Sequence, residues 1–507
     1  MNTPSLILPP LVVEVNGTAL DADVCAALAE VYVQQRLSRP TQCELTFLDA
    51  PDTVGRAMQP GATLQVGLAG EAEPLFQGEI TAAEFGYAPA HGRELRVRGY
   101  DRLHRLRKRQ PVRAHVQVGL EELTRELVAD LGLAVQTAAS VPPLLWRRLI
   151  QHGQTNLDVL DEITEACGLF YTLRGSTLHL LTLEGDGDPM PLTLGSTLLE
   201  ARVEANGEPS CRSVSTSGWD PLRMERHAGD ADSPRLGRRI AAEVPPDRVG
   251  GAPERMLVSR AVQDDRQAQA LAQAELDSRA AREVTLSAVA EGDPRLRTGA
   301  LVEIAGLDQA FNGVYVLSSV IHRIDSQHRF VTELSTSPPA PRKRPGGASV
   351  ALGIVTRVDD PEGIGRVQVS LPAFDGVQTD WMNVLMLGAG GEKGLMIMPD
   401  VDDRVVVLCA QEDPAQGVVL GGLYGVTGPP DSGVEGTAVR RYTLQTPGGQ
   451  RVRLDDAKKL VRIENQHGSF LEMTPSKLSL HAHADLQISA PGHTVTISAK
   501  AINFEEA

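Results

Sequence analysis

The sequence predicts a mainly β, multidomain protein, and three features support this fold class. Glycine (48) and proline (33) are abundant among the 507 residues, while aromatic residues make up only 4%, a composition typical of many short strands joined by turns. A chain of this length is too long for one ordinary hydrophobic core, so about two to four domains are expected. The C-terminal part repeats a short alternating pattern and behaves differently from the rest.

The N-terminal part, residues 1–337, combines strand and helix patterns. A helix between Gly119 and Gly132 has a natural stop at Gly132, and a second begins near Asn156 and ends at Gly168. Alternating or β-rich segments predict the strands. The expected strands cover residues 11–15, 44–48, 63–68, 94–98, 283–289, 301–304 and 314–320, and a third helix, rich in Ala and Gln, covers about 264–282.

Residues 338–348 predict a stiff linker, because this region is rich in proline and glycine and has little apolar content. The next segment, residues 349–425, contains five strand candidates bounded by Gly, Pro or Asp. Five short strands in a segment of this size predict a small closed barrel of the OB type. A second linker is expected at residues 426–440. The five candidates are residues 353–356, 366–371, 395–398, 404–408 and 418–420.

The tail, residues 441–507, is interpreted as a repeat, because short strand patterns recur about every nine residues between turn clusters. Each strand presents one apolar face, while the opposite face carries Ser, Thr, Lys, His and Gln. The residues expected on the apolar stripe are Val461, Ile463, Leu471, Met473, Leu478, Leu480, Leu486, Ile488, Val495 and Ile497.

A strand ladder with one narrow apolar stripe cannot bury that stripe by itself, and its open edges invite pairing. Three identical chains wrapped around one axis would bury all three stripes and pair every edge. We therefore expect a homotrimeric β-prism (β-helix) needle. A single-chain β-solenoid and a monomeric sandwich are the alternatives, and the repeats are few and thin for a self-sufficient core.

Charge and cysteine content narrow the classes of function. The net charge of −16 argues against nucleic-acid partners, and residues 352–425 carry eleven Asp and Glu against four Lys and Arg, the wrong sign for an OB domain that binds single strands. The five cysteines are far apart, which suits buried thiols in a reduced compartment. No apolar stretch is long enough to span a bilayer, and no secretory signal is evident.

Enzyme motifs are absent from the sequence, so no catalytic residues and no cofactor are predicted. There is no HExxH, GxSxG, P-loop or dinucleotide fingerprint. The glycine-rich stretch at residues 388–394 lacks the Ser or Thr and the spacing of a phosphate loop, and paired acids such as Asp402 and Asp403 are typical of turns. Residues 426–440 are too few for an inserted catalytic domain, and no fused toxin is expected after the tail.

Several stretches together resemble the VgrG spike proteins of type VI secretion systems and the matching spikes of extracellular contractile injection particles and contractile phage tails. The match runs through most of the chain in the family's domain order. One departure is residues 401–404, where the family usually has a Gly-Asp-Glu turn. The matching stretches are residues 75–80, 95–103, 154–157, 167–169, 176–180, 353–355, 365–369, 381–384, 394–399, 422–425, 488–492 and 496–500.

This resemblance implies a hub at residues 1–337 with two tube-docking β-barrels and a helix-strand insert at about 111–190. Trimerised, the hub would dock onto a hexameric inner-tube protein and contact baseplate proteins. The OB domain would form a collar and the prism a shaft capped by a PAAR-type tip protein, with effector cargo as a further partner. The target membrane would be contacted only mechanically.

Two local features of the tail leave alternatives open. The last strand candidate, Ala501, Ile502, Asn503 and Phe504, is either the tip surface that receives the capping protein or the last turn of the prism. His481 and His483 are two residues apart, so in a strand their side chains point to the same face. If that face is the inner one, three chains would aim six imidazoles at one axial metal ion. Since the apolar residues of this strand are even-numbered, an unbroken strand instead points both histidines to solvent, and we predict no metal.

The sequence predicts assembly in the cytoplasm, followed by delivery outside the cell or into a target cell as part of a particle. The compact length favours an extracellular or phage-tail-like particle, and a type VI secretion VgrG is the alternative.

Overall fold

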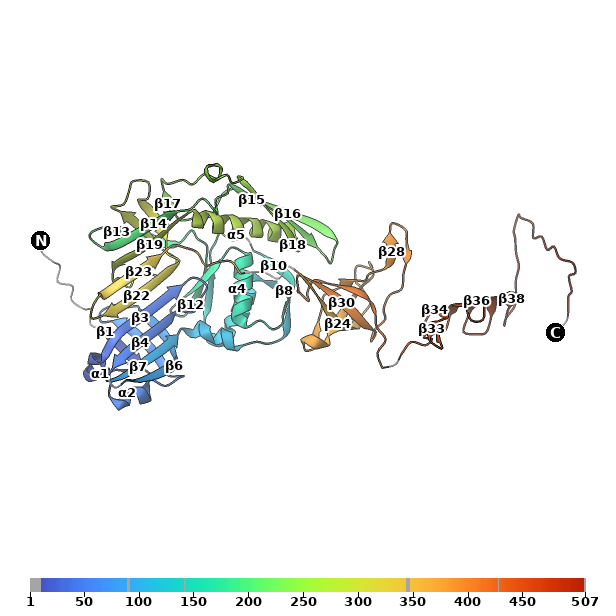
Figure 1. The fold of residues 1–507 in the computed structure, drawn as a ribbon, viewed down its shortest axis with the longest axis horizontal. Helices are drawn as coiled ribbons and strands as arrows, with labels where there is room; N and C mark the ends of the chain where they lie inside the picture. The colour runs from blue at the N-terminus through green and yellow to red at the C-terminus, as the bar shows by residue number, and fades with distance from the viewer. Residues whose placement is uncertain (1–10, 89–91, 141–142, 343–346, 427, 506–507) are drawn as a thin grey trace. The chain divides into compact units, whose positions relative to one another are not determined.

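The structure is a computed structural model, and it is mainly β with many separate sheets (Figure 1), which confirms the predicted fold class. It divides into two compact units, Met1–Gly422 and Leu423–Ala507. Parts of both predicted linkers, residues 343–346 and 427, lie outside the described residues. No described helix is both long and apolar enough to cross a membrane. The structure describes residues 11–88, 92–140, 143–342, 347–426 and 428–505.

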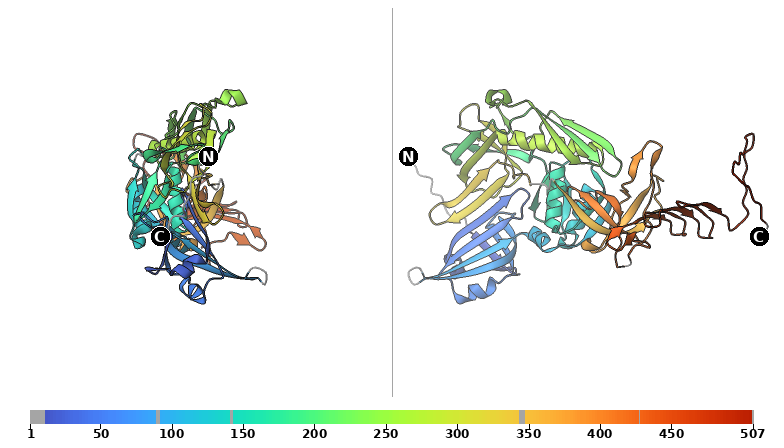
Figure 2. Two further views of the ribbon diagram at one scale, coloured as in Figure 1. Left: turned by 90° about the vertical axis from the view of Figure 1, so that its left-hand side faces the viewer. Right: turned by 45° about the vertical axis from the view of Figure 1, so that its right-hand side comes forward.

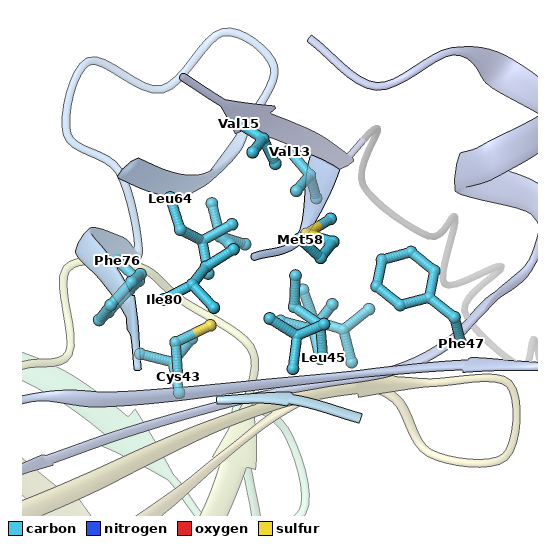
Figure 3. Packing of buried hydrophobic residues seen from close by; sticks show 14 of the residues in the cluster. Val13, Val15, Cys43, Leu45, Phe47, Met58, Leu64, Phe76 and Ile80 are labelled. Atoms are coloured by element: carbon cyan, nitrogen blue, oxygen red, sulfur yellow. The ribbon is translucent and has the colours of Figure 1, made fainter. Parts of the chain in front are cut away.

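The first strand module, residues 11–100, is an antiparallel sheet in the order β3-β4-β7-β6-β5-β1. Alternate side chains of each strand point to one face, and there Leu45, Phe47 and Ile80 are buried together (Figure 3). All four strands expected here are confirmed. The elements are β1 (Leu11–Val15), β2 (Thr18–Ala19), α1 (Ala22–Ala26), β3 (Leu28–Arg36), β4 (Gln42–Leu48), α2 (Asp52–Ala57), β5 (Thr63–Leu68), β6 (Phe76–Ala88) and β7 (Gly92–Tyr100).

The insert that follows packs two helices on small sheets around its own core. Thr155 caps the second helix, because its hydroxyl accepts from the Asp158 backbone N–H while the Asp158 carboxylate accepts from Thr155. Gly132 (φ 63°) and Gly168 (φ 68°) adopt the left-handed conformation just past the helical segments, as predicted. The elements are β8 (Arg113–Gly119), α3 (Leu120–Val128), β9 (Ala134–Thr137), β10 (Leu145–Gln151), α4 (Asn156–Ala166), β11 (Phe170–Arg174) and β12 (Thr177–Leu181), with short 3-10 turns at Arg102–Lys108 and Ala129–Leu131.

Four strands of the second strand module, residues 186–205 and 284–335, continue the same sheet, because β22 pairs with β3 of the first module. The other three, β13, β20 and β21, belong to a separate four-stranded sheet. The strand expected at residues 314–320 is wrong in one respect: it is split into β21 and β22. The chain changes partners at Leu317 and Ser318, where β21 leaves its pairing with β20 and β22 joins β23 and β3. The elements are β13 (Asp186–Thr193), β14 (Leu198–Ala205), β19 (Val284–Glu291), β20 (Ala300–Ala305), β21 (Gly313–Val316), β22 (Ser319–Asp325) and β23 (Arg329–Ser335).

A long helix and a three-stranded sheet connect the two halves of the second module. The helix, α5 (Asp265–Glu283), confirms the Ala- and Gln-rich pattern, and its buried alanines allow close packing on the sheet. Gly229 on β16 lies against the helix backbone, where a Cβ would come within 2.2 Å of the Gln269 nitrogen. The sheet elements are β15 (Ser213–Asp220), β16 (Glu225–Ala231) and β18 (Glu254–Ala261), and β17 (Arg239–Ile240) pairs with β21, with a 3-10 turn at Pro246–Val249.

Residues 348–422 form a closed barrel. β24 pairs with β25 and β30, β30 pairs with β31, and β27 closes the ring by pairing with β25 while Val384 bridges to Val419 of β31. The expected barrel strand at residues 395–398 is wrong, because β29 pairs only with β28 in the part of the chain that the structure describes, and Met396 is 82% exposed. The elements are β24 (Ala348–Arg357), β25 (Arg366–Leu371), β26 (Val377–Gln378), β27 (Met382–Asn383), β28 (Leu387–Gly390), β29 (Lys393–Leu395), β30 (Arg404–Ala410) and β31 (Gly417–Gly422), with a 3-10 turn at Pro372–Phe374.

The second unit contains a five-stranded antiparallel meander in chain order, whose strands lie side by side in Figure 2. Beyond His481 the described residues form no strand, so the strands expected around Leu486, Val495 and Ile502 are absent from the single chain. Each of these segments would need a pairing partner that one chain does not supply. The elements are β32 (Val434–Glu435), β33 (Ala438–Val439), β34 (Arg441–Gln445), β35 (Arg451–Asp455), β36 (Leu460–Glu464), β37 (Phe470–Met473) and β38 (Leu478–His481).

Candidate self-association surface

The meander carries two continuous rows of apolar side chains on one face, here called the apolar ladder. Residues directly opposite each other in an antiparallel pair point to the same side, so the strand register defines each row. Both rows cross all five strands without a polar interruption. The first row is Tyr442, Leu454, Val461, Met473 and Leu478, and the second row is Leu444, Val452, Ile463, Leu471 and Leu480.

The reverse face of the same sheet is polar, and several of its charged side chains form hydrogen bonds with one another. Arg462 donates to Glu464 at 2.6 Å and to Glu472 at 2.8 Å, and its guanidinium lies 4.0 Å from the ring centroid of Phe470. His481 stacks on Phe470 with 5.0 Å between ring centroids. The hydrogen bonds that Arg462 donates to Glu472 and to Glu464 hold the pKa of Arg462 above its usual value. One face of the sheet is therefore apolar and the other carries this ion-pair network, so the sheet is amphipathic.

No described residue of the second unit covers the apolar ladder. Leu480 is 59% exposed and Leu478 is 65% exposed, and no apolar side chain among described residues 423–505 is buried. A groove of about 510 Å³ follows the second row and reaches Leu486. Isolated apolar residues on a surface are ordinary, but a contiguous apolar face of this kind marks an interaction site.

The structure brings together only part of the predicted stripe. Val461, Ile463, Leu471, Met473, Leu478 and Leu480 lie on the apolar ladder, whereas Leu486, Ile488, Val495 and Ile497 follow the last strand and are exposed. Sequence reasoning missed the ladder residues of β34 and β35. The same alternation of apolar and polar residues in these two strands was the signal that would have found them. The missed residues are Tyr442, Leu444, Val452 and Leu454.

The two histidines differ in their surroundings. His481 ends β38 on the polar face, opposite in direction to Leu480, as the parity argument predicts. His483 lies beyond the strand, and its backbone N–H donates to the Ser469 hydroxyl at 2.9 Å. No group of three or more metal-binding side chains occurs among the described residues.

The tip residues predicted from sequence, Ala501, Ile502, Asn503 and Phe504, have no regular structure. All four are exposed, and Phe504 reaches 93%. Phe504 is a large aromatic side chain that a single chain leaves in water.

Comparisons with known proteins add to this geometry. Residues 8–326, more than half of the chain, match the family model of the Alg8 N-terminal domain. The chain belongs to this family. Downstream of the Alg8 N-terminal domain, residues 351–424 match the model of the type VI secretion system/phage-baseplate injector OB domain, which coincides with the closed barrel. A search of the curated proteins found no match.

Solved structures share the fold of this Alg8-family chain at low sequence identity. An E. coli protein, c3393, described as a component of the type VI secretion system with structural similarity to T4 bacteriophage tail proteins gp27 and gp5, matches with a TM-score of 0.50 and 12% identity, over 81% of this chain and 99% of its own. A chain of the half-lidded Francisella PdpA-VgrG complex matches with a TM-score of 0.53 and 8% identity, over 93% and 87%. These matches confirm, at the level of fold, the resemblance to VgrG-like spike proteins and to phage tail components.

Proposed function

We propose that this chain is a non-enzymatic, homotrimeric central spike of a contractile injection machine, which joins an inner tube to a membrane-piercing tip. The observation that carries the proposal is the apolar ladder, which spans five strands and is uncovered in the single chain. Burying such a face stabilises an assembly by about 25 cal/mol per Å² of apolar surface. Three copies around one axis cover all three ladders, and they supply pairing partners for the segments after His481.

In this proposal, residues 1–337 form the hub, 349–425 the collar and 441–507 the shaft, with linkers at 338–348 and 426–440. The two strand modules of the hub would face a hexameric inner-tube protein, because three chains with two modules each present six similar surfaces. Baseplate proteins would surround the hub. The uncovered residues 501–504 would receive a PAAR-type tip protein. The mechanism is the transmission of force from a contracting sheath, so the spike needs mechanical stiffness and no catalytic residues. Effector cargo would travel with the spike.

The domain order supports both an extracellular or phage-tail-like particle and a type VI secretion VgrG. We favour the particle, assembled in the cytoplasm and then delivered outside the cell or into a target cell. Single-strand nucleic-acid binding by the OB barrel is not supported. The barrel segment is acidic, and its Trp381 ring already lies 5.1 Å from the Arg357 guanidinium.

The mass of the purified chain in solution tests the proposal. One chain is 54.4 kDa, so light scattering on a sizing column should give about 163 kDa for a C3-symmetric trimer. Leu480→Lys places a charge on the apolar ladder and should reduce the mass to that of one chain. Ser479→Lys, on the adjacent residue of the opposite face and directly across from Glu472, is the matched control and should remain trimeric. A folded wild-type monomer would contradict the proposal.

A further inference from the structure

One turn from the middle of the chain belongs to the core of the barrel. Leu222 lies in the turn between β15 and β16, at residues 221–224, and is 7% exposed. It packs in the cluster of buried side chains that, among the described residues, is otherwise formed by positions 351–419, with Val367 and Met382 among them. A side chain from far upstream in the sequence therefore completes the barrel core. We call residues 221–224 the plug.

The plug has a defined shape of its own. The carboxylate of Asp220, which is 1% exposed, accepts hydrogen bonds from the backbone N–H groups of Leu222 at 2.9 Å and Arg223 at 3.2 Å. Arg147 of β10 donates to the other oxygen of this carboxylate. Met224 adopts the left-handed conformation (φ 58°), and its N–H donates to the Asp220 carbonyl at 2.8 Å. Because the turn is fixed from its own side, little conformational freedom is lost when it contacts the barrel.

The barrel binds the backbone of the plug. The amide nitrogen of Asn383 donates to the Pro221 carbonyl at 3.0 Å and to the Leu222 carbonyl at 2.9 Å. Asn383 belongs to β27, the short strand that closes the barrel by pairing with β25. A buried apolar anchor with polar contacts around it is the arrangement that carries most of the binding energy in protein interfaces. We call the contact between the plug and the barrel the joint.

Smaller contacts surround the joint. In the polar contacts an arginine comes from the segment before residue 343, and the acceptor comes from the acidic barrel segment. A cavity of about 540 Å³ lies beside them, between α4 and residues 411–416 of the barrel, so close packing is concentrated at the plug. The contacting pairs are Arg148 with the Gln378 carbonyl, Arg223 with Glu362 at 4.0 Å, and His152 with Phe374, whose ring centroids are 5.1 Å apart.

The described part of the peptide linker is fastened to the upstream side and not to the barrel. Arg342 forms ion pairs with Asp158 at 3.3 Å and with Asp161, both on α4. Arg282 of α5 donates to the Pro339 carbonyl at 2.7 Å. The contacts that hold the barrel come from other segments of the chain, so they do not require an intact linker.

We propose that the plug holds the barrel on the upstream part of the chain independently of the peptide linker, so that the two parts stay together after the linker is cut. The joint itself depends on contacts within one chain. Its mechanical role rests on the proposed function: a force that enters through residues 1–337 reaches the barrel through a buried contact and not through the linker backbone alone.

A cleavable linker in the full chain tests the proposal. The recognition sequence of a site-specific protease is inserted between Arg344 and Pro345, and the folded protein is cut and run on a sizing column with light scattering. The two pieces should elute together. Leu222→Asp places a carboxylate in the apolar core of the barrel and should release the barrel piece. Met224→Asp adds the same charge on the same turn at a side chain that is 61% exposed, and its pieces should stay together.

A second variant covers the case in which Leu222→Asp does not fold. Asn383→Ala keeps Leu222 in place and removes both amide hydrogen bonds to the plug, so the cut pieces should bind each other at least about tenfold more weakly. Gln378→Ala is the matched control, because Gln378 contacts Arg148 through its backbone carbonyl, which the substitution retains. Equal affinities for Asn383→Ala and Gln378→Ala overturn the joint.

The outcomes separate the joint from the proposed function. Cut wild-type pieces that elute apart, or Leu222→Asp pieces that elute together, overturn the joint. The mass of the uncut protein tests the trimer by itself. A wild-type monomer contradicts the proposed function and leaves the joint to be decided by the cut, because the plug and the barrel belong to the same chain. A trimer whose cut pieces separate contradicts the joint alone.

Discussion

Arg366 and Asp360 form a two-point ion pair beside the barrel strand β25. Arg366 Nη2 donates to Asp360 Oδ1 at 2.7 Å, and Nε donates to Oδ2 at 3.1 Å. The two side chains are 5% and 3% exposed, and the hydrogen bonds from Arg366 lower the pKa of Asp360 to about 2. Asp360 Oδ2 also accepts from the backbone N–H of Ile364 at 3.1 Å. The pair therefore fixes the loop that leads into β25.

Removal of one partner of this pair should destabilise the barrel. In Arg366→Met the carboxylate of Asp360 stays buried without its cation, and a loss of about 3 kcal/mol in the free energy of unfolding is expected. Urea unfolding is followed by fluorescence in a background in which Trp146 and Trp219 are replaced by Phe, so that Trp381 alone reports on the barrel. Arg404→Met, which replaces an exposed arginine of the same barrel, is the control and should change stability by less than about 1 kcal/mol. Equal effects of the two variants would contradict the structural role of Arg366.

The N-terminal unit should lose stability as the pH falls below neutrality because of His322. Burial lowers the pKa of His322 to about 4, against the opposing effect of Asp293, while an unfolded histidine has a pKa of about 6.5. The unfolded chain therefore takes up the proton first. The stability that neutral His322 contributes is complete above about pH 6.5 and is lost progressively as the pH falls towards 4.

The variant His322→Gln isolates this effect. It should lose about 2 kcal/mol less than the wild type between pH 7 and pH 5, measured as the free energy of unfolding in urea. His328→Gln is the matched control, since His328 is exposed on the same hairpin, and it should follow the wild-type pH profile. Parallel profiles for wild type and His322→Gln would show that His322 is not the titrating group.

Gly229 should tolerate no side chain. A Cβ at this position would lie 2.2 Å from the Gln269 nitrogen and 2.5 Å from the Ala268 carbonyl carbon, both in the backbone of α5. Gly229→Ala should therefore push the helix from its sheet and cost about 2–3 kcal/mol in thermal unfolding experiments. Gly391→Ala, at a position with open space around it, is the control. An unchanged melting temperature for Gly229→Ala would contradict the close packing.

Deletion of residues 502–507 should abolish binding of a PAAR-type tip protein and leave the trimer intact. The apolar ladder, which the proposal assigns to contacts between chains, lies upstream of this segment and is retained. Affinity capture of the purified tip protein gives the binding result, and light scattering gives the mass of the spike. Unchanged capture would assign the tip surface to another part of the shaft.

The sequence by itself determined the fold class, the helices and most strands. Helix stops at Gly132 and Gly168 and the alternation in residues 63–68 and 366–371 are local signals, and local geometry depends on a few neighbouring residues. Six residues of the apolar ladder followed from the same alternation. The resemblance to VgrG-like spikes also followed from residues alone, and the comparisons confirm it at the level of fold.

Only the tertiary structure decided which strand pairs with which. The apolar run at residues 395–398 looks like a barrel strand, yet the two-residue strand at Met382–Asn383 closes the barrel, because closure depends on hydrogen-bond partners distant in sequence. A sequence pattern reports which face of a strand is apolar, whereas the neighbour that covers this face is set by long-range pairing.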